Sequence, residues 1–236
     1  MGEKMGLIFQ QLFEKESSTY TYLLGCEKTR EAVLIDPVIE TIERDLKLVS
    51  ELGLRLIYVL DTHIHADHIT AAGEIRRRTS AKTAVSEGAQ VECMDLALGD
   101  GDVIRFGEFE ITARKTPGHT DSCICFVMSD RVFTGDTLLI RGCGRTDFQQ
   151  GSAEKLFESV HTKLFTLPPE TLVYPAHDYN GLTSSTIAAE MKWNPRLGGG
   201  NSKETFVKIM SELKLANPKK IHEAVPANLG CGTRRD

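Results

Sequence analysis

The sequence predicts an α/β protein built as a four-layer αββα sandwich, in which two β-sheets pack face to face and helices cover their outer sides. Strand-like runs occur in two consecutive blocks along the chain, and a helical pattern follows each block. A strand block and an amphipathic helix each carry an apolar face that another layer must cover, and the sandwich covers them all. With 236 residues, the chain is long enough for one large domain, or for a domain with a small appendage, around a substantial core.

The first block begins with three strand-like runs, at residues 7–13, 20–25 and 32–36. A helix closed by Gly53 is predicted next, because apolar residues recur three or four positions apart at Ile39, Ile42, Leu46, Val49 and Leu52. A strand at residues 56–60 then leads into a polar loop. An amphipathic stretch follows this loop, with Ile69, Ala72, Ile75 and Arg76 at its marker positions.

The second block consists of short strands separated by turns, at residues 82–85, 102–106, 110–113, 124–128 and 131–133. A helix is expected to begin at Ser152, which is a good N-cap and has Glu154 in the following turn, and to run to about residue 164. Another strand is predicted at residues 172–174.

The last third of the chain is predicted to be mostly helical, at residues 183–193 and 202–213, and to end in an irregular segment at 224–228. We therefore divide the chain into a core domain, residues 1–180, and a C-terminal helical extension, residues 181–236, that packs on this core.

The segment most informative about function is the polar loop, whose residues 62–68 read THIHADH. It places three imidazoles and a carboxylate close together, at His63, His65, Asp67 and His68. Imidazole and carboxylate are ligands of borderline divalent metals such as Zn, Fe(II) and Mn. Three further candidate ligands each follow a strand-like apolar run, namely His119, Asp136 and His177. This pattern indicates a metalloenzyme.

These side chains can bind metal in two ways, and ligand identity alone leaves both open. Two adjacent ions could share Asp136; one would also use His63, His65 and His119, and the other Asp67, His68 and His177. Dinuclear sites of this kind clamp an attacking water in hydrolysis. Alternatively, a single ion held by two histidines and one carboxylate keeps open positions, the arrangement of Fe(II) oxygenases.

Two of the candidate ligands are preceded by glycine, His119 by Gly118 and Asp136 by Gly135. We expect tight turns at these positions, where a side chain would crowd the metal or where φ is positive.

The composition excludes several other classes of function. Lys and Arg number 28 against 33 Asp and Glu, so the net charge is −5, and without a basic block nucleic acid is not an expected partner. No apolar run approaches the ~20 residues needed to span a bilayer. Residues 7–9 already form a strand, so we expect no secretory signal, and any transit peptide is absent from this chain. The six cysteines lack the spacing of a disulfide framework, which favours buried thiols in a reducing compartment and leaves the roles of Cys143 and Cys231 open.

The ordered set of candidate ligands resembles the metallo-β-lactamase fold superfamily over nearly the whole chain: His63, His65, Asp67, His68, His119, Asp136 and His177. This resemblance implies the αββα fold, with residues 1–180 as the catalytic core. Antibiotic-hydrolysing members typically lack an aspartate in the place of Asp136, and nucleic-acid-processing members usually carry a large inserted domain. Neither of these two activities is therefore expected.

Within the superfamily, the chain is similar to two families that act on glutathione derivatives. One is glyoxalase II, a dinuclear thioesterase that hydrolyses hydroxyacylglutathione. The other is the persulfide dioxygenase family (the ethylmalonic encephalopathy protein family), which binds one iron. Residues 135–151, GDTLLIRGCGRTDFQQG, resemble the dioxygenases, whereas glyoxalase II lacks the Thr-Asp insertion. Residues 194–197 and 224–228 also resemble the dioxygenases, and glyoxalase II typically has a longer helical tail.

The resemblance implies a role for each candidate residue. His63, His119 and Asp136 would hold one Fe(II) per chain, and in the hydrolase alternative two Zn or Fe ions would be bound. The other four donors would orient the ligands and water by hydrogen bonds or, in that alternative, complete a second metal site: His65, Asp67, His68 and His177. Glutathione contacts are expected from Arg145, Tyr179 and Arg196, with a structural tie of the 141–151 loop as the alternative role of Arg145.

The expected reaction converts glutathione persulfide, O2 and water to sulfite and glutathione, as part of sulfur catabolism. By the same resemblance we expect a homodimer without nucleic-acid or membrane partners. It would lie in the mitochondrial matrix of a eukaryote or in the cytoplasm of a bacterium.

Overall fold

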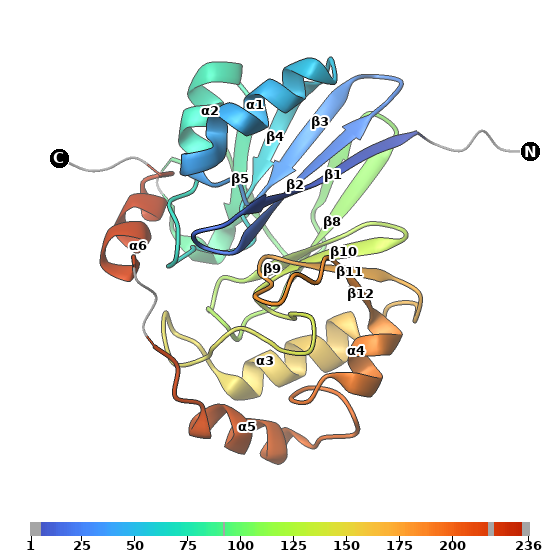
Figure 1. Ribbon diagram of the computed structural model, residues 1–236, viewed down its shortest axis with the longest axis vertical. Coiled ribbons are helices and arrows are strands. Elements are labelled where there is room, and N and C mark those ends of the chain that lie inside the picture. The colour runs from blue at the N-terminus through green and yellow to red at the C-terminus, as the bar shows by residue number, and fades with distance from the viewer. Residues whose placement is uncertain (1–5, 92, 217–219, 233–236) are drawn as a thin grey trace, which may run out of the picture.

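The computed structural model describes residues 6–91, 93–216 and 220–232 and confirms the four-layer sandwich. Figure 1 shows two facing sheets, with α1 and α2 outside the first sheet and α3, α4 and α5 outside the second. These helices are α1 (Ile42–Glu51), α2 (Ala72–Thr79), α3 (Ala153–Ser159), α4 (Ile187–Trp193) and α5 (Lys203–Glu212). In the part of the chain that is described, no helix has the length and apolar character needed to cross a membrane.

The first sheet has six strands in the order β1-β2-β3-β4-β5-β6. The β1–β2 and β2–β3 pairs are antiparallel, whereas β3 to β6 run parallel to one another. The prediction missed the short β6, which pairs with β5. It also grouped the strand at residues 82–85 with the second block, whereas this strand is β5 and pairs with β4 in the first sheet. The bounds are β1 (Leu7–Glu14), β2 (Thr19–Cys26), β3 (Glu31–Ile35), β4 (Arg55–Leu60), β5 (Lys82–Ser86) and β6 (Leu96–Leu98).

The second sheet also has six strands, in the order β12-β11-β10-β9-β8-β7. Strands β7 to β10 form an antiparallel meander, and β11 lies parallel to β10. The two-residue β12 lies where a helix was expected; α4 starts only after it, with Thr186 as its N-cap. The bounds are β7 (Val103–Phe106), β8 (Phe109–Lys115), β9 (Ile124–Val127), β10 (Arg131–Gly135), β11 (Leu172–Pro175) and β12 (Ser185–Thr186).

Large clusters of apolar side chains lie between the layers. Between the two sheets lie large aromatic side chains, including Tyr22, Phe126 and Phe133. Helices α3, α4 and α5 cover the outer side of the second sheet, where Leu156 and Phe206 are fully buried. Residues beyond 180 thus contribute strand β12 to this sheet, and helices α4 and α5 to the helical layer that packs on it. The division of the chain at residue 180 stays a prediction.

The segment at 224–228, predicted to be irregular, is instead part of helix α6 (Ile221–Leu229). Proline normally breaks a helix because it removes a backbone donor, and Pro226 lies inside this one. Ala224, Ala227 and Asn228 are nevertheless buried against the rest of the protein. Most helical stability in proteins comes from such packing, which outweighs the local preference.

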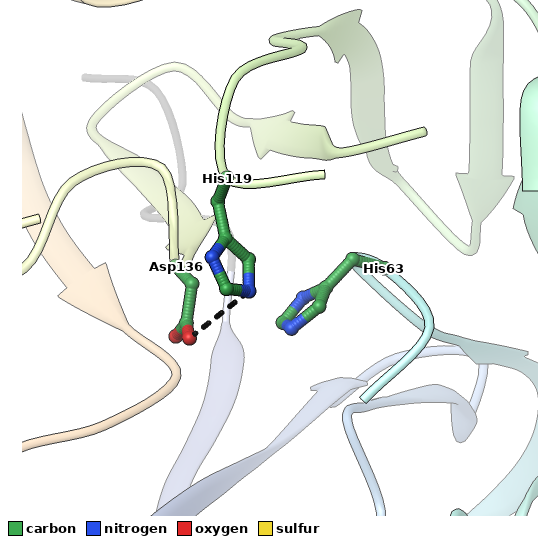
Figure 2. A group of neighbouring side chains, drawn as sticks. All are labelled: His63, His119 and Asp136. Atoms are coloured by element: carbon green, nitrogen blue, oxygen red, sulfur yellow. Dashed lines mark ion pairs between the residues drawn. The ribbon is translucent and has the colours of Figure 1, made fainter. Parts of the chain in front are cut away.

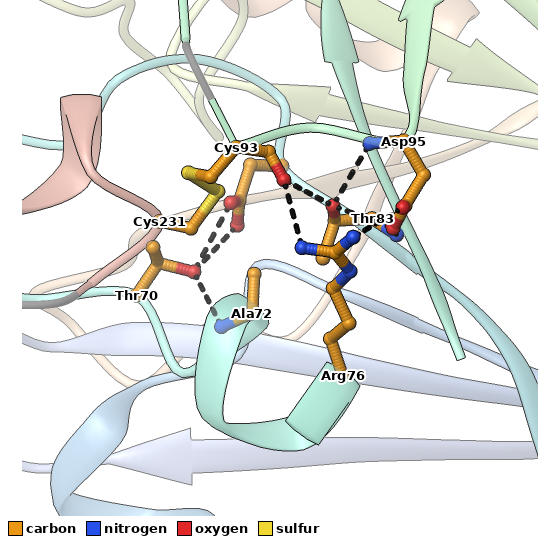
Figure 3. The surroundings of a disulfide bond; sticks show 8 residues. Thr70, Ala72, Arg76, Thr83, Cys93, Asp95 and Cys231 are labelled. Carbon is orange, nitrogen blue, oxygen red and sulfur yellow. Dashed lines mark hydrogen bonds and ion pairs between the residues drawn. A yellow bond between two sulfur atoms is a disulfide. The ribbon is translucent and has the colours of Figure 1, made fainter. Parts of the chain in front are cut away.

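Two of the six cysteines form a disulfide, contrary to the expectation that all are thiols. Cys93 and Cys231 are joined across a sequence separation of 138 residues, and Cys231 is buried (Figure 3). A pairing over this distance leaves no sequence spacing from which it could be inferred. The other four cysteines are buried and free, as expected: Cys26, Cys123, Cys125 and Cys143.

Replacement of Leu156 by alanine tests the packing of α3 on the second sheet. Leu156 is fully buried, so Leu156→Ala should lower the free energy of unfolding by about 2–5 kcal/mol through lost burial and a residual cavity. The measurement is urea unfolding followed by circular dichroism. Its exposed neighbour Lys155 is the control, because Lys155→Ala should change this value by less than about 0.5 kcal/mol. Equal effects of the two substitutions would contradict the packing described.

Candidate metal centre

The seven predicted ligand side chains come from loops that leave the carboxyl ends of four strands. Residues 63–68 follow β4, His119 follows β8, Asp136 directly follows β10, and His177 comes soon after β11. Because β10 and β11 are parallel, their carboxyl ends lie at the same edge of the second sheet. The fold therefore brings side chains far apart in the sequence to one place.

His63, His119 and Asp136 form one group, with one potential ligand atom from each residue within 4.8 Å of the others. Figure 2 shows the three side chains pointing toward a common space, with His119 Nε2 lying 3.5 Å from Asp136 Oδ2. The group offers two imidazoles and one carboxylate from one side. That is the donor set of a mononuclear site with open positions.

Hydrogen bonds leave the Nε2 atom of both imidazoles in this group free for a metal. His119 Nδ1 donates to the carbonyl of Arg145 at 2.7 Å. The Thr62 hydroxyl donates its proton to Asp36, so it accepts from His63 Nδ1 at 3.0 Å. Burial, together with the nearby imidazoles of His65 and His119, holds the pKa of His63 well below its usual value and keeps the ring neutral.

The carboxylate of the group also fits a metal. Asp136 Oδ1 is buried and has no hydrogen-bond partner among the described residues, although His177 Nε2 lies 3.6 Å from it. A buried carboxylate oxygen without a hydrogen bond is costly, and a coordinated cation would remove that cost. The donor set, the free Nε2 atoms and this oxygen without a hydrogen bond together match a divalent cation.

His65, Asp67 and His177 form a second group, also with ligand atoms within 4.8 Å of one another. This differs from the dinuclear arrangement predicted above, in which His65 shared an ion with His63 and His119. Hydrogen bonds already occupy part of the group: Asp67 Oδ2 accepts from His68 Nδ1 at 2.9 Å, and His177 Nδ1 donates to the carbonyl of Ser18 at 3.2 Å.

The carboxylate of Asp67 also interacts electrostatically with the imidazoles near it in this second group. Burial alone would raise the pKa of Asp67, but the imidazoles of His68 and His177 hold it well below its usual range. His68 lies outside both groups, although it was predicted to be a ligand of the second ion, and it contacts Asp67 instead.

Asp36, which was not among the predicted site residues, binds the start of the polar loop, which we call the metal loop (residues 62–70). Its carboxylate accepts from Thr62 N at 2.7 Å, from Thr62 Oγ1 at 2.9 Å and from His65 Nε2 at 3.1 Å. Burial works to lower the pKa of His65, but the Asp36 carboxylate raises it to about 9. Its place at the end of a buried strand was the only sequence signal, and that place does not distinguish it from a surface turn residue.

Both glycines that precede ligands have positive φ, as predicted. The atoms that a Cβ at these positions would contact belong to the protein, however, and not to the metal site. Gly118 has a φ of 152°, and a Cβ atom there would lie 2.3 Å from Leu156 Cα. Gly135 has a φ of 51°, and a Cβ atom there would lie 2.6 Å from Thr62 Oγ1. Each glycine thus lets a ligand-bearing loop approach a neighbouring element closely.

A pocket of about 480 Å³ opens over the first group, and the three predicted substrate contacts line it. The guanidinium of Arg145 makes three hydrogen bonds within the protein. It donates to both carboxylate oxygens of Asp147, at 2.6 and 2.7 Å, and to the carbonyl of Ala216 at 2.8 Å. Tyr179 is 72 % exposed and stacks on His177. Arg196 donates to the carbonyl of Cys143 at 3.1 Å, and no carboxylate of the described residues lies within ion-pair distance of it.

Arg141 and Cys143 are among the other residues that line this pocket. Arg141 was not predicted; it pairs with the buried Glu190 and lies over the ring of Trp193. Cys143 is buried, and burial raises the pKa of its thiol to about 11. A protonated, buried thiol is a poor nucleophile, which favours a packing role for Cys143, whose role the sequence left open.

Known proteins resemble this chain in both sequence and fold. The family model described as Metallo-beta-lactamase superfamily matches residues 15–177. A Homo sapiens protein named Persulfide dioxygenase ETHE1, mitochondrial, is 53% identical over 99% of this chain and 92% of its own length. The crystal structure of ETHE1 from Myxococcus xanthus has a TM-score of 0.94 and 54% identity, over 96% of this chain and 100% of that one. A Dictyostelium discoideum protein named Glyoxylase B2 is only 28% identical, over 93% of this chain and 89% of its own length.

Replacement of Gly118 by alanine tests the close approach of the His119 loop to α3. Gly53 is the matched control: its φ is 61°, but nothing lies within 4 Å of the place a Cβ atom would take, so Gly53→Ala adds only backbone strain of about 1–2 kcal/mol. Gly118→Ala adds the overlap with Leu156 and should cost clearly more in urea unfolding. Equal losses for the two variants would contradict the close approach.

Proposed function

This chain belongs to the persulfide dioxygenase family of the metallo-β-lactamase superfamily, and we propose that it oxidises glutathione persulfide with a single iron ion held by His63, His119 and Asp136. The observation that carries this proposal is the group of two imidazoles and one carboxylate at the base of the pocket, in a chain 53% identical to a persulfide dioxygenase over nearly its whole length. The chain is thus a dioxygenase by family, and its metal and substrate are the proposed parts.

His63, His119 and Asp136 would hold the iron at the base of the pocket. Iron bound there would supply the redox chemistry that dioxygen needs. The chain holds the two imidazoles in one tautomer through Thr62 and the Arg145 carbonyl, and it presents both Nε2 atoms and the carboxylate to one point. Its contribution is therefore to fix the donors and position the two reactants.

A single ion is also favoured by the state of the second group. Asp36 accepts a hydrogen bond from His65 Nε2 and raises the pKa of His65 to about 9, so a metal ion bound by His65 would have to displace a proton. Asp67 Oδ2 accepts from His68 Nδ1, which supports the predicted orienting role of these two residues. His177 donates through Nδ1 to the Ser18 carbonyl and keeps Nε2 available, as His119 does, so its hydrogen bonds are compatible with either role.

For the glutathione part of the substrate, Arg196 is the guanidinium most available to a carboxylate. Arg141 and Arg145 also line the pocket, but Glu190 and Asp147 already neutralise them. A guanidinium binds a carboxylate strongly, through two parallel hydrogen bonds. Tyr179 offers an exposed ring at the same pocket. We assign Arg196 and Tyr179 to glutathione binding. Arg145 mainly has the alternative role, in which it stabilises the 141–151 loop.

The net reaction balances without a further reductant. Glutathione persulfide, O2 and water give glutathione, sulfite and two protons; both oxygen atoms of O2 and the oxygen of water end in sulfite. The terminal sulfur is the atom oxidised, and the sulfur–sulfur bond is the bond broken.

A dinuclear thioesterase of the glyoxalase II type is the second candidate function. It is kept because His65 Nδ1 is buried and has no hydrogen-bond partner among the described residues, as a ligand of a second ion would be in the absence of that ion. Two zinc or iron ions per chain and hydrolysis of a glutathione thioester would support it.

The remaining expectations concern assembly and compartment. The human relative carries the word mitochondrial in its name, whereas the structural relative is from a bacterium. From the family resemblance we propose that the protein is a homodimer. It would lie in the mitochondrial matrix of a eukaryote or in the cytoplasm of a bacterium.

Replacement of Asp136 by alanine tests the proposed ligand set. Asp136→Ala removes the only carboxylate of the group, so iron content and oxygen uptake should both fall to less than about one tenth of wild type. The exposed Asp121, two residues after His119, is the control, and Asp121→Ala should retain iron. Iron near one per chain in purified Asp136→Ala, measured by mass spectrometry, would refute the assignment.

The two arginines are distinguished by their kinetics. Arg196→Ala should raise KM for glutathione persulfide by about 10–100-fold with a small change in kcat, because a hydrogen bond to a charged group is worth about 1.5–3 kcal/mol. Arg145→Ala should instead lower Tm and leave KM within about threefold of wild type, because its guanidinium is used within the protein. A larger KM effect for Arg145→Ala than for Arg196→Ala would restore Arg145 as the main glutathione contact.

A further inference from the structure

The backbone of the metal loop, residues 62–70, is held by side chains that come from outside the loop. At its start, Asp36 accepts from Thr62 N. In its middle, Gln149 Nε2 donates to the carbonyl of Ile64 at 2.9 Å. Ile39 N also donates to the carbonyl of Ile69, and the backbone of residues 65, 68 and 70 is bound by one side chain of the C-terminal helix, that of Asn228.

Asn228 makes three hydrogen bonds to this loop with one side chain. Its Nδ2 donates to the carbonyls of His65 and His68, at 2.8 and 2.9 Å, and its Oδ1 accepts from Thr70 N at 2.9 Å. The side chain is buried, so water cannot replace these bonds. Both amide protons and the amide oxygen thus serve the loop. Without Asn228, two carbonyls and one N–H would be buried without partners, a cost that the loop could avoid only by moving.

The Cys93–Cys231 disulfide fixes the end of α6 that carries Asn228. Cys231 N donates to the carbonyl of Asn228 at 3.1 Å, and the Cys231 carbonyl accepts from Gly73 N at 3.0 Å. Figure 3 shows the disulfide beside Thr70 and the first turn of α2. Cys93 and Cys231 belong to the same apolar cluster as Ile64, a residue of the metal loop itself. The bond therefore joins α6, the metal loop and the segment that precedes β6.

We propose that Asn228 is a positioning residue of the metal centre and that the Cys93–Cys231 disulfide holds it in place. Reduction by a dithiol breaks the sulfur–sulfur bond, consumes two electrons and two protons, oxidises the dithiol and leaves two cysteine thiols. Helix α6 then loses its covalent tie to the first half of the chain, and Asn228 loses its fixed distance from His65 and His68. The order of the metal loop, and with it the position of His63, follows the redox state of this bond.

Co(II) binding to the metal-free protein tests the role of Asn228. The inference rests on the metal site of the proposed function, but Co(II) titration needs neither persulfide nor O2, so it stands apart from the choice of reaction. Asn228→Ala should bind Co(II) about 10–100-fold more weakly and with an altered visible spectrum. Asn228→Asp keeps the shape of the side chain and its acceptor for Thr70 N but loses both donors, so it should also bind more weakly.

Asn194 is the matched control, because it is buried as well and its amide makes four hydrogen bonds, all outside the metal loop. Asn194→Ala should lower Tm without a change in Co(II) affinity or spectrum. Wild-type affinity and spectrum in folded Asn228→Ala or Asn228→Asp would overturn the proposal. If Asn228→Ala does not fold, Asn228→Asp and the reduced wild type decide the question.

Reduction tests the role of the disulfide. The protein is treated with a dithiol, the reagent is removed, and Co(II) affinity is measured again; it should fall by about the factor seen for Asn228→Ala. The Cys93→Ser/Cys231→Ser double variant should match the reduced wild type. Because the bond acts through Asn228, reduction of Asn228→Asp should change its affinity by less than about twofold. An unchanged affinity on reduction of wild type, or an equal loss in both backgrounds, would overturn this part of the proposal.

Discussion

The metal centre depends on the buried carboxylate of Asp36. It accepts two hydrogen bonds from Thr62, and the Thr62 hydroxyl in turn accepts from His63 Nδ1, so Asp36 fixes the tautomer of one proposed ligand through one intermediate residue. The same carboxylate pairs with His65. Two imidazoles that are only two residues apart therefore have pKa values shifted in opposite directions: that of His63 is lowered by burial and by neighbouring imidazoles, and that of His65 is raised by Asp36. One carboxylate thus separates a metal-binding group from an ion-paired group.

The sandwich supplies the rigid frame that this separation requires. Loops from four strands converge at the site. Gly118 and Gly135 allow two of these loops to approach α3 and Thr62 at distances that a Cβ atom would prevent. A buried loop must find partners for its backbone groups inside the protein, and Asp36, Gln149 and Asn228 provide them for the metal loop. Packing, backbone geometry and metal-site chemistry are therefore linked at the same few residues.

The sequence predicted the layers and the donor residues because both depend on local patterns. Apolar periodicity located most strands and helices, and the spacing of His63 and its neighbours marked the loop as metal-binding. The features it missed depend on contacts between distant segments. Asp36 could not be distinguished from a turn residue, the tail containing Pro226 is helical only because Ala224 and Ala227 are buried, and Cys93 meets Cys231 only in the folded chain. A structural role for Arg145 was predicted as an alternative. The sequence could not decide between this role and substrate binding, because the contact of Arg145 with Asp147 is seen only in the folded chain.

The central claim is that this chain holds one iron ion and oxidises a persulfide. The most direct measurement combines iron and zinc counts per chain with two assays on the same sample, oxygen uptake with glutathione persulfide and hydrolysis of S-lactoylglutathione. About one iron per chain, with oxygen uptake and sulfite release, is the predicted result. Two metal ions per chain, with thioester hydrolysis and no oxygen uptake, would contradict the account and identify a hydrolase of the glyoxalase II type.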